Sequence, residues 1–231
     1  MSYLGLHQPT AYPMRLLLPA FLVVFTLFGC FEPELPNERL QDEDMYVEDP
    51  EEVRVIWQQP GAVIDAMGDI REKVIADIGA GRGFFTKRLV PYADRVIAVD
   101  VRQEAINYLD TLRRFELPKD LQPRLEPRLG QYDDPLLEEK EVDVILIVNT
   151  FMLIENQVEY LRKLYPTLRS DGRLVIVDFK KKDTQTGPPK ADRLALGTLQ
   201  DMLKEAGFHL VSSDDTTLNY QYIVVADKKT E

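Results

Sequence analysis

The chain has 231 residues and a formal net charge of −11 at pH 7. Apolar residues make up 45% and charged residues 29%, which is ordinary for a globular protein and excludes disorder along the whole chain. The length suits one α/β domain with an extension. Because an acidic surface repels the phosphate backbone, nucleic acid is a disfavoured partner.

The first 30 residues resemble a bacterial secretory signal. They contain no acid and one base, Arg15, ahead of an apolar run of about 14 residues, shorter than the roughly 20 that a membrane-spanning helix needs. The run ends at Leu27-Phe28-Gly29-Cys30, which resembles a lipobox and contains the only cysteine of the chain. We therefore expect a lipidated Cys30 to anchor the protein to the membrane on the periplasmic side of the cell envelope.

Other interpretations of this signal and lipobox segment, residues 1–30, stay open. It could act as an uncleaved hydrophobic anchor, or its first residues could precede the true start. Translation from Met14 would make Arg15 the second residue, which suits a short lipoprotein signal better. If the lipobox is not used, the expected location is the cytoplasm.

Residues 31–52 differ from the rest in composition. They hold ten acids, one arginine and three prolines, with few large apolar side chains. Such a segment cannot bury enough surface to offset its ordering entropy, so we interpret it as an acidic flexible tether. From residue 53 to residue 231 the pattern is that of one globular domain.

This domain alternates apolar, strand-like runs with helical stretches. We expect strands at 73–78, 96–99, 124–129, 142–148, 173–177, 208–213 and 220–226. We expect helices at 84–90, 103–115, 157–168 and 199–206, with capped starts at Asn156 and Thr198 and a terminating Gly207. The alternation predicts a doubly wound, mostly parallel seven-stranded sheet, and the last two strands predict an antiparallel C-terminal hairpin.

A glycine-rich turn follows the first of these strands and is the most informative feature of the sequence. It reads Asp77-Ile78-Gly79-Ala80-Gly81-Arg82-Gly83. Glycines let a ligand approach backbone N–H groups, and a helix that starts near Phe84 presents unpaired donors to it. The second strand ends in Asp100, whose carboxylate can accept hydrogen bonds from both hydroxyls of a ribose. The sequence therefore predicts a nucleotide pocket.

The spacing of the glycines separates two classes of pocket. A dinucleotide fingerprint needs a glycine where this chain has Phe84. The pattern D-x-G-x-G-x-G at 77–83 instead resembles motif I of the class I S-adenosylmethionine-dependent methyltransferases. This resemblance implies a Rossmann-like α/β fold with S-adenosyl-L-methionine as cofactor. In that family the first acid orients the amino group of the cofactor and the acid after strand two holds its ribose. The residues expected to bind the cofactor here are Asp77, Gly79, Ala80, Gly81, Gly83, Asp100 and Val101.

The resemblance adds candidates after strands three and four. The family usually has an acid near the adenine amino group after strand three, where Asp133 or Asp134 fits, although an Asx turn before Pro135 is an alternative explanation. After strand four, Asn149 is a further cofactor-site candidate. Asn149 is not followed by the Pro-Pro-Tyr run of methyltransferases that act on base amino groups, so methylation of nucleic-acid bases is disfavoured.

A segment upstream of motif I, Arg54-Val55-Ile56-Trp57-Gln58-Gln59-Pro60, resembles one found in a group of bacterial methyltransferase-domain proteins. There it would lie across the cofactor mouth, with Trp57 and Gln58 near the ligand. A packing role is the alternative for the tryptophan. The lysine-rich loop at 180–190 either covers an acceptor pocket or is simply solvated.

The resemblance implies methyl transfer to an unidentified small-molecule or protein acceptor. Asp178, Asn149 and Tyr132 stand at plausible places for proton transfer, but the sequence assigns no catalytic residue. No histidine or cysteine cluster indicates a metal. The alternative is a membrane-tethered, non-catalytic protein that binds S-adenosylmethionine or a related nucleoside. A nicotinamide-dependent oxidoreductase is disfavoured by Phe84 and by the terminal hairpin.

Overall fold

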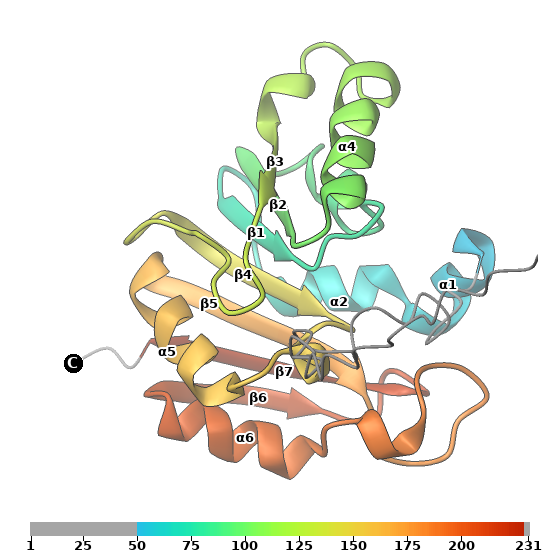
Figure 1. The fold of residues 1–231 in the computed structure, drawn as a ribbon, viewed down its shortest axis with the longest axis vertical. Helices are drawn as coiled ribbons and strands as arrows, with labels where there is room; N and C mark the ends of the chain where they lie inside the picture. The colour runs from blue at the N-terminus through green and yellow to red at the C-terminus, as the bar shows by residue number, and fades with distance from the viewer. Residues whose placement is uncertain (1–49, 229–231) are drawn as a thin grey trace, which may run out of the picture. The chain divides into compact units, whose positions relative to one another are not determined.

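The structure is a computed structural model and describes residues 50–228 (Figure 1). The signal and lipobox expected at 1–30 and most of the acidic tether lie outside the described residues. The first helix begins at Glu51, so the last two residues assigned to the tether are helical. In the part of the chain that the structure describes, no helix is both long enough and apolar enough to cross a bilayer.

One seven-stranded sheet forms the centre of the described chain, with the strand order β3-β2-β1-β4-β5-β7-β6. The first five strands are parallel, and β7 runs antiparallel to both β5 and β6. This confirms the predicted Rossmann-like fold with its C-terminal hairpin. The strands are β1 (Val74–Ile78), β2 (Arg95–Asp100), β3 (Leu125–Leu129), β4 (Val142–Val148), β5 (Leu168–Phe179), β6 (Phe208–Asp214) and β7 (Gln221–Lys228).

Helices cover both faces of this sheet, and each face has its own apolar core. Residues of α2, α3 and α4 belong to one core cluster, and residues of α5 and α6 belong to the other. Strand β1 supplies both, with Ile75 on the first side and Ala76 on the second, as the period of two requires. The helices are α1 (Glu51–Gln58), α2 (Pro60–Met67), α3 (Thr86–Leu89), α4 (Gln103–Thr111), α5 (Gln157–Thr167) and α6 (Leu196–Glu205).

The helix boundaries differ from the sequence prediction in several places. Helices α1 and α2 were not expected. Asn156 is the N-cap residue of α5, as predicted, but it is left-handed and makes no side-chain cap bond. The start predicted at Thr198 is wrong, because α6 begins at Leu196 and Thr198 lies inside it. Leu196 packs against the core beneath α6, which explains the earlier start. Gly207 ends α6 with φ +94°, as predicted.

Candidate functional site

The candidate residues meet where the strand order reverses, between β1 and β4. Ligands in open α/β sheets bind at this point, beyond the carboxyl ends of the strands. The glycine loop leaves β1 there, Asp100 ends β2, and Asn149 follows β4. The N–H groups of Gly79 and Ala80 donate to the Val99 carbonyl at 2.8 and 3.0 Å, so the start of the loop is tied to β2.

Asp77 lies at the base of this site and is only 3% exposed. One of its carboxylate oxygens accepts a hydrogen bond from the Thr86 hydroxyl at 2.6 Å. Burial raises the pKa of Asp77 to about 6, against the opposing effects of the Thr86 hydroxyl and the nearby Arg54 charge. A buried carboxylate of this kind is stabilised in its charged form by a cationic ligand such as an ammonium group.

The absence of a side chain has a different structural consequence at each of the three loop glycines. Gly79 has φ +74°, and a Cβ there would overlap the Thr150 side chain. Gly83 has φ +77° and packs tightly against Leu109 and Leu112. A Cβ at Gly81 would meet only the Arg102 guanidinium, at 3.8 Å. Only at Gly81, therefore, does the missing side chain leave room for a ligand.

Asp100 holds the other side of the loop and is 5% exposed. Its carboxylate accepts hydrogen bonds from Gly81 N at 2.9 Å and from Arg102 N at 3.0 Å. The Arg102 side chain, 64% exposed, adds a bond from Nε at 3.2 Å. Since this exposed side chain can swing into solvent while the backbone bonds persist, the carboxylate can accept ribose hydroxyls. Asp77, Gly81 and Asp100 therefore fit an adenosyl cofactor with a cationic amino group.

The other residues expected to bind the cofactor have contacts of their own within the protein. Val101 is half-buried beside Asp100. Asp133 forms an ion pair with Lys163 at 3.0 Å, which holds the pKa of Asp133 below its usual range. Asp134 accepts a hydrogen bond from Leu136 N at 2.8 Å, the geometry of the Asx turn considered as the alternative.

Helix α1 reaches the site from the N-terminal side. Trp57 is buried and packs against Phe179 and Tyr220, with ring centroids 5.6 and 6.2 Å away, so the packing role is realised. Gln58 is fully buried, and the Arg54 guanidinium lies over the Phe84 ring at 4.1 Å. Helix α1 thus packs against Phe84, which directly follows the glycine loop, and against Phe179 and Tyr220 at the end of β5 and just before β7.

Sequence reasoning missed several residues of this site. Thr86 and Thr150 are polar groups without a motif, and their contacts with Asp77 and Gly79 depend on the loop geometry. Gln221 could have been found, because an antiparallel final strand must begin at the edge where the parallel strands end. Its amide donates a hydrogen bond to the Asn149 side chain.

Asp178, considered for proton transfer, is fully buried at the end of β5. Its Oδ2 accepts a hydrogen bond from Met152 N at 3.1 Å, whereas Oδ1 is a buried side-chain oxygen with no hydrogen-bond partner in the described structure. Burial raises the pKa of Asp178 to about 8, so the group is mostly protonated at pH 7. Tyr132, another of the three residues considered for proton transfer, is exposed.

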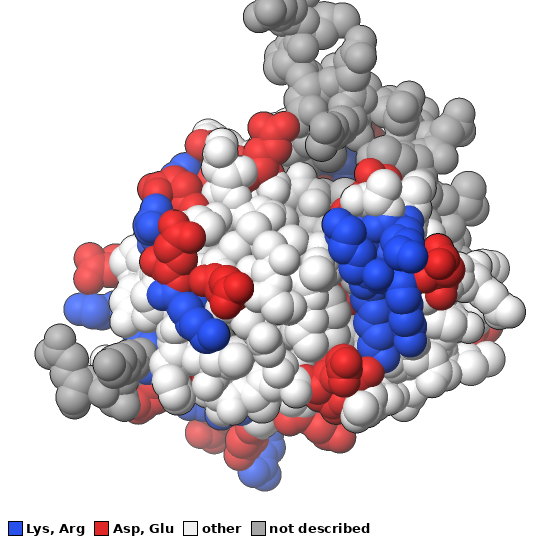
Figure 2. Space-filling view, turned by 90° about the horizontal axis from the view of Figure 1, so that it is seen from below, with Lys and Arg blue, Asp and Glu red and all other residues white. Residues whose placement is uncertain are grey.

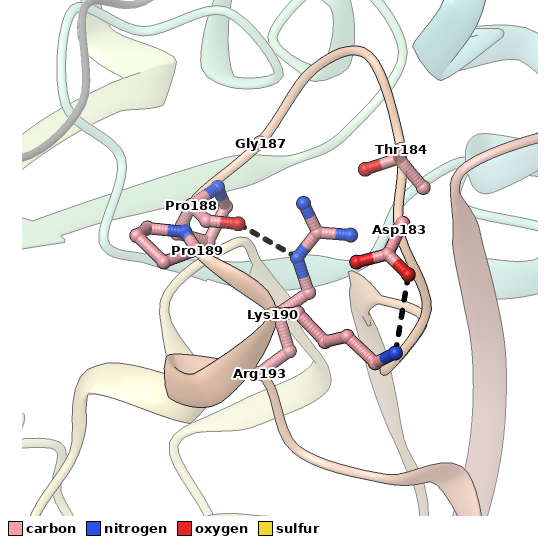
Figure 3. Close-up of a pocket in the computed structure, with 7 residues that line it drawn as sticks. All are labelled: Asp183, Thr184, Gly187, Pro188, Pro189, Lys190 and Arg193. Atoms are coloured by element: carbon pink, nitrogen blue, oxygen red, sulfur yellow. Dashed lines mark hydrogen bonds and ion pairs between the residues drawn. The ribbon is translucent and has the colours of Figure 1, made fainter.

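The lysine-rich loop folds around one buried arginine, Arg193 (Figure 3). Its guanidinium donates to carbonyl oxygens of the loop, at 2.8 Å to Pro188 and Lys182 and at 3.2 Å to Lys180 and Thr186. A hollow of about 300 Å³ lies beside it.

Figure 2 shows a stripe of Lys and Arg side chains on the face seen from below, next to an area without charged groups.

Comparison with known proteins agrees with this geometry. Residues 76–176 match the family described as a methyltransferase domain. An uncharacterized methyltransferase of Schizosaccharomyces pombe is 28% identical over 127 residues, which cover 52% of this chain and 44% of that protein. The chain thus matches less than half the length of this curated relative.

Solved structures share the fold at low sequence identity. An S-adenosylmethionine-dependent methyltransferase from Aquifex aeolicus has a TM-score of 0.68 and 23% identity over 75% of this chain and 91% of its own. A putative type 11 methyltransferase from Sulfolobus solfataricus has a TM-score of 0.57 and 23% identity, over 80% and 94%. The [4+2]-cyclase SpnF also matches, with a TM-score of 0.65 and 13% identity over 75% and 81%. The described residues therefore share the class I methyltransferase fold, and S-adenosylmethionine is the expected cofactor.

Proposed function

We propose that the protein transfers a methyl group from S-adenosylmethionine to a small-molecule or protein acceptor. One arrangement carries this proposal: Asp77 and Asp100 flank the open backbone at Gly81, at the point where the strand order reverses. A buried carboxylate suits the ammonium of the methionine part, and the second carboxylate suits the ribose hydroxyls.

The cofactor supplies an activated methyl group together with its leaving group. The protein contributes alignment and exclusion of water, and alignment alone can provide about 7 to 11 kcal/mol of barrier reduction when the reacting atoms are held in line. Asp77 and Asp100 would fix the two ends of the cofactor. The aromatic cluster of Trp57, Phe179 and Tyr220 would keep water from the acceptor side.

Two measurements on the full chain test the proposal. Calorimetric titration should show binding of S-adenosylmethionine and S-adenosylhomocysteine but not of NAD, and Asp100→Ala should abolish binding while circular dichroism shows an intact fold. Labelled-methyl transfer to a cell extract should then mark an acceptor. Unchanged affinity in the Asp100 variant would remove the ribose assignment.

The same labelling experiment addresses a non-catalytic binding protein. The match to the [4+2]-cyclase SpnF indicates that this fold is not confined to methyltransferases. A binder without chemistry would bind the cofactor in the calorimeter but would label nothing in the extract.

We further propose, from residues 1–30, that lipidation of Cys30 attaches the protein to the cell envelope. In this proposal the acidic residues after Cys30 separate the domain from the membrane. Labelled palmitate should enter the wild-type protein, whereas Cys30→Ala should prevent incorporation and move the protein out of the membrane fraction. Equal labelling of both proteins would refute lipidation at this cysteine.

A further inference from the structure

Four polar side chains form a continuous hydrogen-bonded chain at the carboxyl edge of the sheet. Arg54 Nε donates to Gln58 Oε1 at 2.6 Å, and Gln58 Nε2 donates to Gln221 Oε1 at 3.1 Å. Gln221 Nε2 then donates to Asn149 Oδ1. Both glutamines are fully buried, so neither amide can exchange these partners for water. The chain links α1, the start of β7 and the end of β4.

Arg54, the first of the four side chains, determines the direction in which the hydrogen bonds of this series are donated. A guanidinium has donors and no acceptor, so Gln58 must turn its carbonyl oxygen to Arg54. The Gln58 amide nitrogen then faces Gln221, which must present oxygen, and the Gln221 nitrogen consequently faces Asn149. Although amide nitrogen and oxygen are interchangeable in shape, only one of the two orientations satisfies every contact.

Asn149 is the last member of this hydrogen-bonded series and directly precedes Thr150, which packs against Gly79. It takes a left-handed conformation, with φ +57°, directly after β4, and its N–H donates to the Val177 carbonyl at 2.8 Å. Asn149 is half-buried, whereas the two glutamines are fully buried. Because Oδ1 is taken by Gln221, the Nδ2 group remains as the polar end that can meet a ligand.

We propose that Arg54, Gln58 and Gln221 orient Asn149 so that its amide N–H group donates to the methyl acceptor, which must therefore carry an anionic or carbonyl oxygen at that point. This inference rests on the proposed function and specifies its substrate class. A carboxylate or phenolate would accept the hydrogen bond, whereas an ammonium group would meet a second donor and be rejected.

The charges around the acceptor side agree with this choice. Asp178 lies behind the loop that contains Asn149, since it accepts a hydrogen bond from Met152 N, and burial keeps it mostly protonated at pH 7. It therefore provides no negative charge to attract an amine. Lys180, Lys181 and Lys182 follow the next strand and contribute positive charge that favours an acidic acceptor.

The direction of the chain can be tested without any acceptor. In Asn149→Asp, an oxygen can still accept from Gln221, so the melting temperature should stay within about 2 °C of wild type, a change below about 1 kcal/mol. If Asn149 instead presented nitrogen to Gln221, the new carboxylate would face a carbonyl oxygen. Exposed Asn219→Asp is the matched control. A loss of more than about 5 °C in Asn149→Asp alone would refute the direction.

The ligand class is tested on the full chain saturated with S-adenosylhomocysteine. Nuclear magnetic resonance identifies the Asn149 side-chain amide by its disappearance in Asn149→Asp. Titration with benzoate should shift this signal, and benzylammonium, similar in size and opposite in charge, should not. Benzoate affinity should fall at least tenfold in Asn149→Asp and in Gln221→Glu, which forces Asn149 to turn its oxygen outward, and should persist in Asn219→Asp. A shift with benzylammonium, or with neither probe, would overturn the proposal.

The proposed methyltransferase function and the proposed acceptor class can be refuted separately. If S-adenosylhomocysteine does not bind, the proposed methyltransferase function fails, while the melting temperatures still report the direction of the amide chain. If S-adenosylhomocysteine binds and benzoate leaves the Asn149 signal unmoved, only the acceptor class is wrong.

Discussion

Gly79 and Thr150 lie so close that a side chain on the glycine would overlap the threonine hydroxyl. The glycine loop after β1 and the loop after β4 are therefore in direct contact at the point where the strand order reverses. This contact places Asn149, the neighbour of Thr150, beside the glycine loop. In the proposed function, the position of the acceptor relative to the cofactor consequently depends on a residue without a side chain.

We expect Gly79→Ala to damage both folding and binding. The new Cβ would collide with Thr150 and would sit at φ +74°, a conformation that costs a residue other than glycine about 1 to 3 kcal/mol. Urea unfolding should show that loss, and calorimetry should show at least tenfold weaker binding of S-adenosylhomocysteine. Gly197→Ala in α6 is the control, because nothing lies within 4 Å of its Cβ position and the substitution should stabilise by about 0.4 to 1 kcal/mol. Equal stability of the two variants would contradict the steric argument.

Arg102→Ala should leave cofactor binding intact or strengthen it. Its side chain occupies the Asp100 carboxylate from the solvent side, whereas the backbone bonds from Gly81 and Arg102 itself do not need the guanidinium. An exposed ion pair contributes only about 0 to 1 kcal/mol to stability, so the melting temperature should change little. Calorimetry with S-adenosylhomocysteine checks this expectation, and a tenfold loss of affinity would show that Arg102 itself contacts the cofactor.

Cofactor binding should weaken as the pH falls below about 6. Burial raises the pKa of Asp77 to about 6, so its proton must leave before the carboxylate can pair with an ammonium group. Affinity for S-adenosylhomocysteine should drop by up to about tenfold per pH unit between pH 6 and pH 5. Asp77→Asn should bind weakly with no such pH dependence. A flat wild-type profile would exclude Asp77 as the partner of the ammonium group.

The sheet could be predicted from the sequence because each strand is an apolar run ended by a turn. Even β3 pairs along Leu125–Leu129 despite Pro127, since it lies at the edge of the sheet. Helices α1 and α2 were missed because α1 is strongly acidic at its start and follows directly from the tether-like segment. The cap prediction failed at α6 because packing of Leu196 outweighed a local side-chain preference.

The site was predictable where chemistry follows a motif and not where it depends on contacts distant in sequence. Asp77, the glycines and Asp100 were found by their spacing, and the structure places them together. The partner of Gln58 is 163 positions away along the chain, and the bond exists only because β7 is antiparallel. No local pattern encodes that pairing. Asp178 was noticed from its place after a strand, but its complete burial follows from packing.

Arg193→Met should open the lysine-rich loop without unfolding the domain. The guanidinium holds several carbonyl oxygens of residues 180–188 and lies over the Phe179 ring at 5.2 Å. Removing it leaves those carbonyls to water, so trypsin should cleave at Lys181 or Lys182 at least tenfold faster while the far-ultraviolet circular dichroism is unchanged. Lys190→Met, which removes only an exposed ion pair with Asp183, is the control. Equal cleavage rates in the two variants would show that Arg193 does not hold the loop.

The stability of the protein should fall with rising pH because of Asp178. Burial raises the pKa of its carboxyl from 3.8 to about 8, so the folded state retains a proton that the unfolded state has already released. The stabilisation associated with this proton is complete below pH 3.8 and is lost as the pH rises through about 8. Between pH 3.8 and about 8, each unit of rising pH should cost up to about 1.4 kcal/mol of unfolding free energy, and above about pH 8 the loss from this group is complete.

Asp178→Asn keeps the shape of the side chain and cannot ionise, so this variant should lack the loss. Urea unfolding at pH 7 and pH 9 measures both proteins, and Asp183→Asn, at a highly exposed position, corrects for the other groups that titrate in the same range. Parallel pH profiles for the wild type and Asp178→Asn would mean that the carboxyl is already ionised at pH 7. Its buried Oδ1 would then require a hydrogen-bond donor, because an ionised carboxylate oxygen without one is too costly to bury.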